Sequence, residues 1–294
     1  MKFIVGSILT LLITISLNSY LFIEIEEMQK ITRLYSSNNA DEIILLGSSR
    51  CHGSLIPSLI SDEKQVYNYG VSGSGNKLWL AELRDLVDDS NSQTIIVNVD
   101  RTITFSLDGG DGDFRYYLNT PRKTAVYELL SNETKDQLSP FPFYWFGQLA
   151  EFIRLYIRER INTTGYTEKG CRIELNYLSP EQFERGAKPY LGKSEMSTDF
   201  ARILTEISNR NQKDRIIFIS LPVFGAPVEI KPSYEEIQRI IGEGAYYLPF
   251  DMVISERDDF YDKNHPSLTG AQKISRALSY ELKKLKSAVT SSIE

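Results

Sequence analysis

Four short, mostly apolar runs, spread along the chain, constrain its fold more than any other feature. Each run has the length of a strand, and apolar residues at nearly every position are typical of strands buried on both faces of a parallel sheet. The runs are Ile43–Leu46, Val66–Tyr69, Thr94–Val99 and Arg215–Leu221. A fifth strand is predicted at Ala245–Val253, although Pro249 interrupts it.

Amphipathic helical patterns lie between these runs. Apolar residues recur at three- and four-residue spacing, which predicts helices at Lys77–Val87, Phe200–Ile207 and Ser267–Leu285. Strands that alternate with helices form parallel sheets with right-handed crossovers. We therefore expect one three-layer α/β domain over residues 41–290, with a sheet of about five strands.

Residues 105–195 are more than such a domain needs, and we predict that they form a helical and aromatic insertion. The insertion opens with an acidic loop at residues 108–113, which lacks the carboxylate spacing of a calcium loop and is expected to be a solvated turn. A helix is predicted at Arg122–Gln137. The aromatic cluster at residues 141–146 is either a hydrophobic contact beneath a lid or a surface for sugar rings or the membrane.

The N-terminal segment Phe3–Ile23 carries no charged residue. As a helix it would span about 30 Å, the thickness of the hydrocarbon core of a bilayer. We predict an uncleaved membrane anchor at residues 1–24 and a juxtamembrane linker at 25–40, in a single-pass protein of the cytoplasmic membrane. Lys2 before the segment puts the N-terminus inside and the remaining chain outside. A cleaved signal peptide is the alternative, although the segment fits a small-x-small cleavage site poorly.

Charge and the counts of cysteine and histidine argue against several classes of function. With 33 Lys and Arg residues against 39 Asp and Glu, the net charge of −6 argues against a nucleic-acid partner held by charge. Cys51 and Cys171 are too far apart in sequence for a zinc knuckle or a CxxC redox site, and two histidines are too few for a histidine-rich metal centre. We therefore expect neither a metal nor a cofactor.

Three separated loops carry the residues that point to chemistry. Ser49 follows the first strand just before an apparent helix, where α/β proteins bind ligands and backbone N–H groups can stabilise an oxyanion. The second strand ends in a glycine-rich turn that contains Gly73. Near the C-terminus, Asp262 precedes His265 by three residues. A carboxylate at that spacing can accept a hydrogen bond from the ring Nδ1–H and leave Nε2 free as a general base.

This combination resembles the SGNH (GDSL-like) hydrolases, a family with a flavodoxin-like sheet. Gly47-Ser48-Ser49 matches the family's Gly-Asp-Ser block, with serine in place of the aspartate. Residues 68–73 resemble its second block, and Asp262 with His265 matches the last one. The resemblance implies that Ser49 is the nucleophile and His265 the base. It also implies that Asp262 orients His265 and that Gly73 is an oxyanion donor.

The third block of the family departs from its pattern here. The family has an oxyanion asparagine beyond the third strand, whereas this chain reads Val97-Asn98-Val99-Asp100-Arg101-Thr102. Asn98 lies within the predicted strand and Thr102 lies nearer the expected position. Both are candidates for oxyanion or substrate binding.

Two residues beside Ser49 leave alternatives open. Arg50 is a candidate for substrate binding, through an anionic group, and equally for a structural ion pair. His52 has no acidic partner near it in sequence, so we interpret it as a helix residue or a substrate contact and not as the base.

The resemblance implies a serine esterase or O-acyltransferase that acts on acyl esters, chiefly acetyl esters, of a cell-surface polysaccharide. An N-terminal anchor followed by a Gly-Ser-Ser block is similar to SGNH-like proteins of the cell envelope, including the DltD-type proteins of teichoic-acid D-alanylation and the acetylation proteins of exopolysaccharide systems. A membrane acyltransferase is then an expected partner. The rival hypothesis is a catalytically degenerate SGNH-fold protein that binds a glycan or such a partner, which the irregular third block and the aromatic insertion favour.

Overall fold

The structure is a computed structural model of the 294-residue chain. It describes residues 9–10, 12–14, 16–17, 29–36, 42–88, 94–99, 111–112, 114–117, 120, 122–138, 153, 156–157, 165–175, 178–185, 198–210, 215–225, 245–250 and 253–291. The chain divides into two compact units, a smaller one of Met1–Ser37 and Phe114–Thr164 and a larger one of Asn38–Asp113 and Gly165–Glu294.

The larger unit is built on a parallel sheet of five strands, as predicted. In sheet order the strands are β2 (Gln65–Asn68), β1 (Glu42–Leu46), β3 (Thr94–Asn98), β6 (Arg215–Ser220) and β7 (Ala245–Pro249). Counted along the chain this order is 2-1-3-4-5, which is compatible with a flavodoxin-like fold. The chain reverses direction across the sheet between β1 and β3, and ligands bind at such a point in open α/β sheets.

Alternate residues of the strands pack on opposite faces of the sheet, because the side chains of a strand alternate between its two faces. One set lies in a hydrophobic cluster with residues of the C-terminal helix α11 (Leu268–Ser291): Ile43, Leu45, Ile96, Ile217 and Ile219. The intervening residues are equally buried: Ile44, Leu46, Ile95, Val97, Ile216 and Phe218. Both faces of the sheet are therefore covered, which explains the continuous apolar runs in the sequence.

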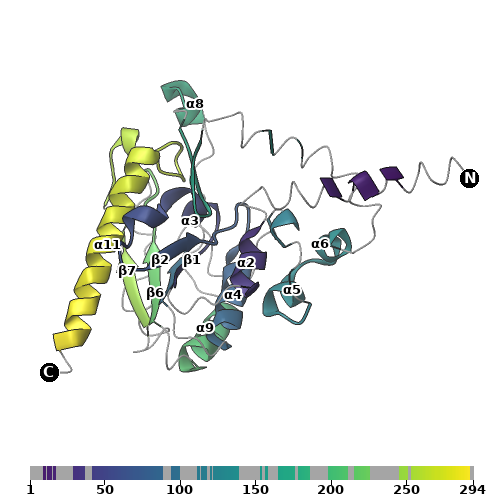
Figure 1. The fold of residues 1–294 in the computed structure, drawn as a ribbon. Coiled ribbons are helices and arrows are strands. Elements are labelled where there is room, and N and C mark those ends of the chain that lie inside the picture. Colours follow the sequence, from purple (N-terminus) through teal and green to yellow (C-terminus); the bar gives the residue numbers. More distant parts are fainter. Residues whose placement is uncertain are drawn as a thin grey trace, which may run out of the picture. The chain divides into compact units, whose positions relative to one another are not determined.

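The predicted helices at the three amphipathic patterns are confirmed. Figure 1 shows α11 on one side of the sheet, and α4 (Asn76–Asp88) with α9 (Thr198–Arg210) on the other. The helices α4 and α9 contact each other. On its own side, α11 contacts the short helix α3 (Ser49–Ser54) and the 3-10 helix η3 (Pro57–Leu59).

The strand β7 lies at the edge of the sheet and ends at Pro249, so it is shorter than the predicted Ala245–Val253. Proline cannot donate a hydrogen bond to a ladder, and it is tolerated in a strand at the sheet edge. Here Pro249 is the last residue of the edge strand, paired with Ser220 of β6.

A β-hairpin that the sequence pattern did not reveal also belongs to the larger unit. Its strands, β4 (Gly165–Glu168) and β5 (Cys171–Glu174), are antiparallel and joined by Lys169 and Gly170. Both turn residues have positive φ angles, 41° and 81°, as a type I′ turn requires. The buried residues of β5 cluster with Ile56 and Ala271, and the following helix α8 (Pro180–Arg185) buries Phe183 in the main core. This part of the predicted insertion therefore packs within the larger unit.

The smaller unit contains α2 (Lys30–Ser36), the 3-10 helix η4 (Phe114–Tyr117), α5 (Ala125–Leu129) and α6 (Asn132–Gln137). The single helix predicted at Arg122–Gln137 is wrong, because the chain leaves the helical conformation at Leu130 and Ser131, with ψ angles of 144° and 156°. The Ser131 hydroxyl accepts a hydrogen bond from the Thr134 N–H at 3.2 Å and thereby begins a new helix.

The predicted anchor, residues 1–24, lies mostly outside the described residues, and the aromatic cluster at 141–146 lies entirely outside them. Among the helices of the described part of the chain, none is long and apolar enough to cross a membrane.

Candidate active site

Ser49 begins α3 immediately after β1, through a turn that requires glycine. Gly47 has a φ angle of 151°, which lies in the region that favours glycine, and a Cβ there would lie 2.7 Å from the Cβ of Cys51. Ser48 is the N-cap residue, and its hydroxyl accepts a hydrogen bond from the Arg50 N–H at 3.4 Å. As the first helical residue, Ser49 has no acceptor for its N–H within the helix. It therefore presents a hydroxyl and an N–H group at the helix start.

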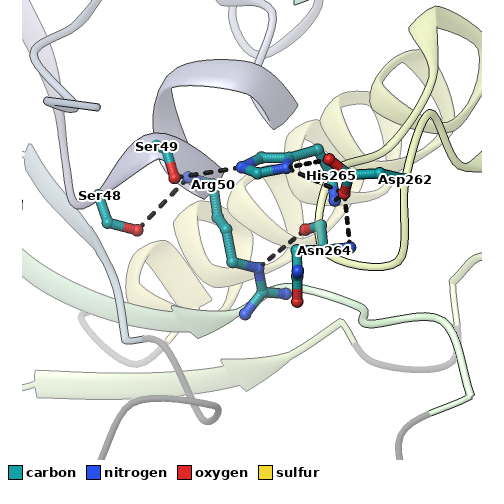
Figure 2. Close-up of polar contacts among 6 residues, drawn as sticks. All are labelled: Ser48, Ser49, Arg50, Asp262, Asn264 and His265. Carbon is teal, nitrogen blue, oxygen red and sulfur yellow. Dashed lines mark hydrogen bonds and ion pairs between the residues drawn. The ribbon is translucent and has the colours of Figure 1, made fainter. Parts of the chain in front are cut away.

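The structure brings Ser49, His265 and Asp262 together into one chain of hydrogen bonds (Figure 2). The Nε2 atom of His265 lies 3.1 Å from the hydroxyl oxygen of Ser49. On the other side of the ring, Nδ1 lies 3.0 Å from both carboxylate oxygens of Asp262. The side chains of His265 and Asp262 are 32% and 29% exposed, so the relay can be reached from solvent. Arrangements of this kind activate a serine hydroxyl for attack on a carbonyl.

The loop that carries Asp262 and His265 is closed by its own hydrogen bonds. Oδ1 of Asp262 accepts the N–H groups of Asn264 and His265, at 2.7 and 2.8 Å. Burial raises the pKa of Asp262, but the hydrogen bond and charge of His265, together with these two N–H groups, outweigh burial and hold the pKa below its ordinary value. The carboxylate is therefore kept ionised, which suits a group that must fix the orientation of an imidazole ring.

Gly73 lies in the turn that follows β2, close to the first turn of α3. Beyond the strands the pairing of β1 with β2 continues, since the N–H of Val71 donates to the carbonyl of Gly47 at 2.9 Å. The chain then turns back at once, because the hydroxyl of Ser74 donates to the carbonyl of Val71 at 2.7 Å. Gly73 is exposed in this turn. It lies two residues after Val71, whose N–H is bonded to Gly47, and Gly47 directly precedes Ser48 and Ser49.

Asn68, the last residue of β2, joins this turn to α3 through side-chain hydrogen bonds. Its Nδ2 donates to the carbonyls of Cys51 and Leu55, at 2.8 and 3.1 Å, and its Oδ1 accepts the N–H of Gly70 at 3.0 Å. The side chain is fully buried and serves carbonyls near the end of the helix that carries Ser49. No sequence pattern indicates this role, although Asn68 occurs in the glycine-rich segment 68–73.

Arg50 is directed at backbone carbonyls. The residue is 4% exposed, and its guanidinium donates to the carbonyls of Asn264, Leu221 and Pro222. These bonds join α3 to the loop of His265 and to the segment that follows β6. In this structure these contacts engage the guanidinium within the protein.

The two candidates from the third block are placed differently. Asn98 is the last residue of β3, is 1% exposed and lies beside Gly47, where an added Cβ would come within 3.0 Å of the Cβ of Asn98. At that burial its side chain faces the protein interior. Thr102 lies outside the described residues.

Gly53 of α3 lies beside the ring of His265 and beside the hairpin strand β5, which the sequence did not indicate. A Cβ at Gly53 would lie 3.9 Å from Cδ2 of His265 and 3.5 Å from the carbonyl oxygen of Arg172 in β5. Gly53 is one helical turn beyond Ser49, on the same side of α3. The His265 ring therefore lies along one face of α3, with the Ser49 hydroxyl at one end of that face. At the other end is Gly53, which has no side chain.

A second contact that the sequence did not predict joins His52 to Ser72. The Nδ1 atom of His52 lies 2.8 Å from the hydroxyl oxygen of Ser72. Of the two interpretations that the sequence allows for His52, a helix residue is confirmed, since His52 is a residue of α3 and is 5% exposed. Its partner belongs to the glycine-rich turn.

The acidic loop also differs from the expected solvated turn where the structure describes it. The Asp111 carboxylate lies 2.9 Å from Nζ of Lys77, and its side chain is only 5% exposed. Within the described residues, no three His, Cys, Asp or Glu side chains are grouped so that they could hold a metal ion.

Comparisons with known proteins identify no family for this chain. No protein-family model matches it, and no curated protein matches its sequence. It is similar to a solved structure from Streptococcus pneumonia that is provisionally named a platelet activating factor, at 14% sequence identity and a TM-score of 0.39. That likeness covers 90% of this chain and 95% of the other.

Proposed function

We propose that this chain is an SGNH-type serine esterase or O-acyltransferase. The observation that carries the proposal is the continuous relay from the Ser49 hydroxyl to Nε2 of His265, at 3.1 Å, and from Nδ1 to the Asp262 carboxylate, at 3.0 Å. Ser49, at the start of α3, is 216 residues away in sequence from His265, which shares its loop with Asp262. Their convergence at the carboxyl edge of a parallel sheet supports a catalytic purpose.

In the first half-reaction, Ser49 Oγ attacks the carbonyl carbon of an ester, and Nε2 of His265 takes the hydroxyl proton. Asp262 keeps Nδ1 protonated and stabilises the imidazolium that forms. The tetrahedral intermediate then collapses, because His265 returns the proton to the departing alcohol oxygen. The products of this half are the free alcohol and an acyl group bound to Ser49.

The oxyanion of the intermediate is stabilised by the backbone N–H groups of Ser49 and Gly73. The N–H of Ser49 is at the start of a helix and has no acceptor within the helix. Gly73 is exposed in a turn whose backbone is bonded to Gly47. Removing one such donor typically lowers the rate by about 10²–10³.

The second half-reaction releases the acyl group from Ser49 to water or to a sugar hydroxyl. We propose acyl esters, chiefly acetyl esters, of a cell-surface polysaccharide as substrates, with the protein held in the cytoplasmic membrane by residues 1–24 and the catalytic unit outside. The support for this is the uncharged segment Phe3–Ile23, followed by a Gly-Ser-Ser block of the type that occurs in SGNH-like proteins of the cell envelope. A membrane acyltransferase is the partner that such a system would require.

Hydrolysis of p-nitrophenyl acetate by the purified full chain tests the proposal. We expect activity in the parent protein and its loss, to the rate without protein, in Ser49→Ala and His265→Ala. Ser287→Ala is the matched control, because its hydroxyl is exposed on α11 and bonds only to carbonyls of that helix in the contacts observed. Full activity in Ser49→Ala would overturn the proposal. A parent that is inactive both alone and with a glycan acceptor present would favour the glycan-binding alternative.

A further inference from the structure

The hydrogen bond between His52 and Ser72 joins the helix of the proposed nucleophile to the turn of the proposed oxyanion donor. His52 lies on α3, three residues after Ser49, and Ser72 directly precedes Gly73. The distance between His52 Nδ1 and Ser72 Oγ is 2.8 Å. His52 is 5% exposed and Ser72 is partly buried, so the bond is partly shielded from water.

The backbone on both sides of Ser72 and Gly73 is already fixed by other contacts. Val71 is bonded to Gly47, and the Ser74 N–H donates to the Val71 carbonyl at 3.3 Å. What these bonds leave free is the orientation of the peptide group between Ser72 and Gly73, whose N–H is the proposed oxyanion donor. A side-chain bond at Ser72 acts on that group directly.

Residues that follow β3 pack against the same turn. Asp111 forms an antiparallel bridge with Ser74, and a Cβ at Gly112 would lie 2.8 Å from the carbonyl oxygen of Ser72. The Lys77 side chain, on α4, pairs with Asp111 at 2.9 Å and fixes this second contact. Ser72 is therefore contacted twice, by His52 at its hydroxyl and by Gly112 at its carbonyl oxygen.

We propose that His52 is a positioning residue for the oxyanion donor: through the hydroxyl of Ser72 it fixes the direction of the Gly73 N–H relative to Ser49. The inference rests on the proposed function, and it gives the second histidine a role distinct from that of the base, His265. A preorganised donor stabilises an oxyanion only when it points to the place where the charge develops. An error of about 1 Å in such an arrangement can lower the rate about 100-fold.

The test compares two substitutions of equal shape at His52. The amide nitrogen or oxygen of asparagine is attached to Cγ, as Nδ1 is in histidine, so His52→Asn can restore the bond to Ser72. Leucine has nearly the same shape as asparagine and cannot form the bond. We expect His52→Leu to lower kcat for p-nitrophenyl acetate by roughly 10-fold or more with little change in KM, and His52→Asn to stay within about 3-fold of the parent.

Ser72→Ala removes the same bond from its other end and serves if His52→Leu does not fold. It should lower kcat as His52→Leu does. The double variant should lose no more than either single one, since both remove one interaction. Equal losses in His52→Asn and His52→Leu, unchanged kcat in Ser72→Ala, or losses that multiply in the double variant would each overturn the inference. Failure of the proposed function is recognised separately, because Ser49→Ala would then be as active as the parent.

Discussion

The Nε atom of Arg50 donates a hydrogen bond to the backbone carbonyl of Asn264, at 3.2 Å (Figure 2). Arg50 directly follows Ser49 in the chain, and Asn264 directly precedes His265. One side chain thus spans the gap between the two loops whose side chains must meet. The same guanidinium also donates to the carbonyls of Leu221 and Pro222, so the segment after β6 is held in the same arrangement.

Replacing Arg50 with methionine is expected to lower both stability and activity. Three carbonyls would lose their donor, two of them buried, and a buried group left without a partner costs about 1–3 kcal/mol. We therefore expect the free energy of unfolding to fall by about 3 kcal/mol or more, measured by urea denaturation. Esterase activity should fall as well, because Asn264 is no longer held beside α3.

Arg50→Lys is the informative companion, because it keeps the charge but lacks the planar fork that reaches several carbonyls at once. Its stability should lie between those of the parent and of Arg50→Met. A lysine variant that equals the parent in both stability and kcat would show that charge alone explains the position of Arg50, contrary to the geometry.

Gly47→Ala is expected to be strongly destabilising for steric reasons. The added Cβ would lie 2.7 Å from Cys51 Cβ and 3.0 Å from Asn98 Cβ, at a φ angle of 151°. Gly225→Ala is the matched control, because Gly225 also has a positive φ, 68°, but has nothing within 4 Å of its Cβ position. The control should cost roughly 1–2 kcal/mol for the conformation alone, and Gly47→Ala should cost clearly more in urea denaturation. Equal costs would contradict the close packing of α3 against β3.

The strands and the long helices could be predicted because their signals are local. Ile43–Leu46 is apolar throughout because both faces of β1 are covered, and this cause is visible in four consecutive residues. The relay could be predicted for a related reason. Asp262 and His265 belong to one loop, and the step from His265 to Ser49 came from a resemblance in the order of separated blocks.

The hairpin and the partners of Arg50 and His52 could not be predicted because their causes are distant in sequence. Every second residue of β5 is charged, and its apolar residues are buried against Ile56 and Ala271, which come from other parts of the chain. The carbonyls that Arg50 meets at Leu221 and Pro222 are 171 and 172 residues away. A backbone carbonyl has no residue type, so no sequence pattern identifies it as a partner.

The size of the side chain at position 53 is expected to determine whether the His265 ring can keep its position beside α3. Gly53→Ala should fold and keep its activity, since the added Cβ would be in ordinary contact with His265 Cδ2 at 3.9 Å. It should gain about 0.5–1 kcal/mol in the free energy of unfolding, because alanine favours the helix over glycine. Gly53→Leu has no room for its further carbons beside the His265 ring and the Arg172 carbonyl, so kcat should fall by 10-fold or more. A leucine variant with the parent's kcat would show that the ring does not lie along this face of α3.

The pH dependence of stability should carry a contribution from Asp262. Because its pKa is lower in the folded protein than in the unfolded chain, the folded state binds fewer protons at this group, and its ionisation stabilises the fold. That contribution is complete above the unfolded value, about 3.9, and is lost as the pH falls through the lower folded value. Asp262→Asn cannot titrate, so the difference in unfolding free energy between the parent and this variant should shrink between pH 5 and pH 3. Urea denaturation of both proteins across that range measures it. A difference that stays constant would mean that the hydrogen bonds from His265, and from the N–H groups of Asn264 and His265, do not favour the ionised carboxylate.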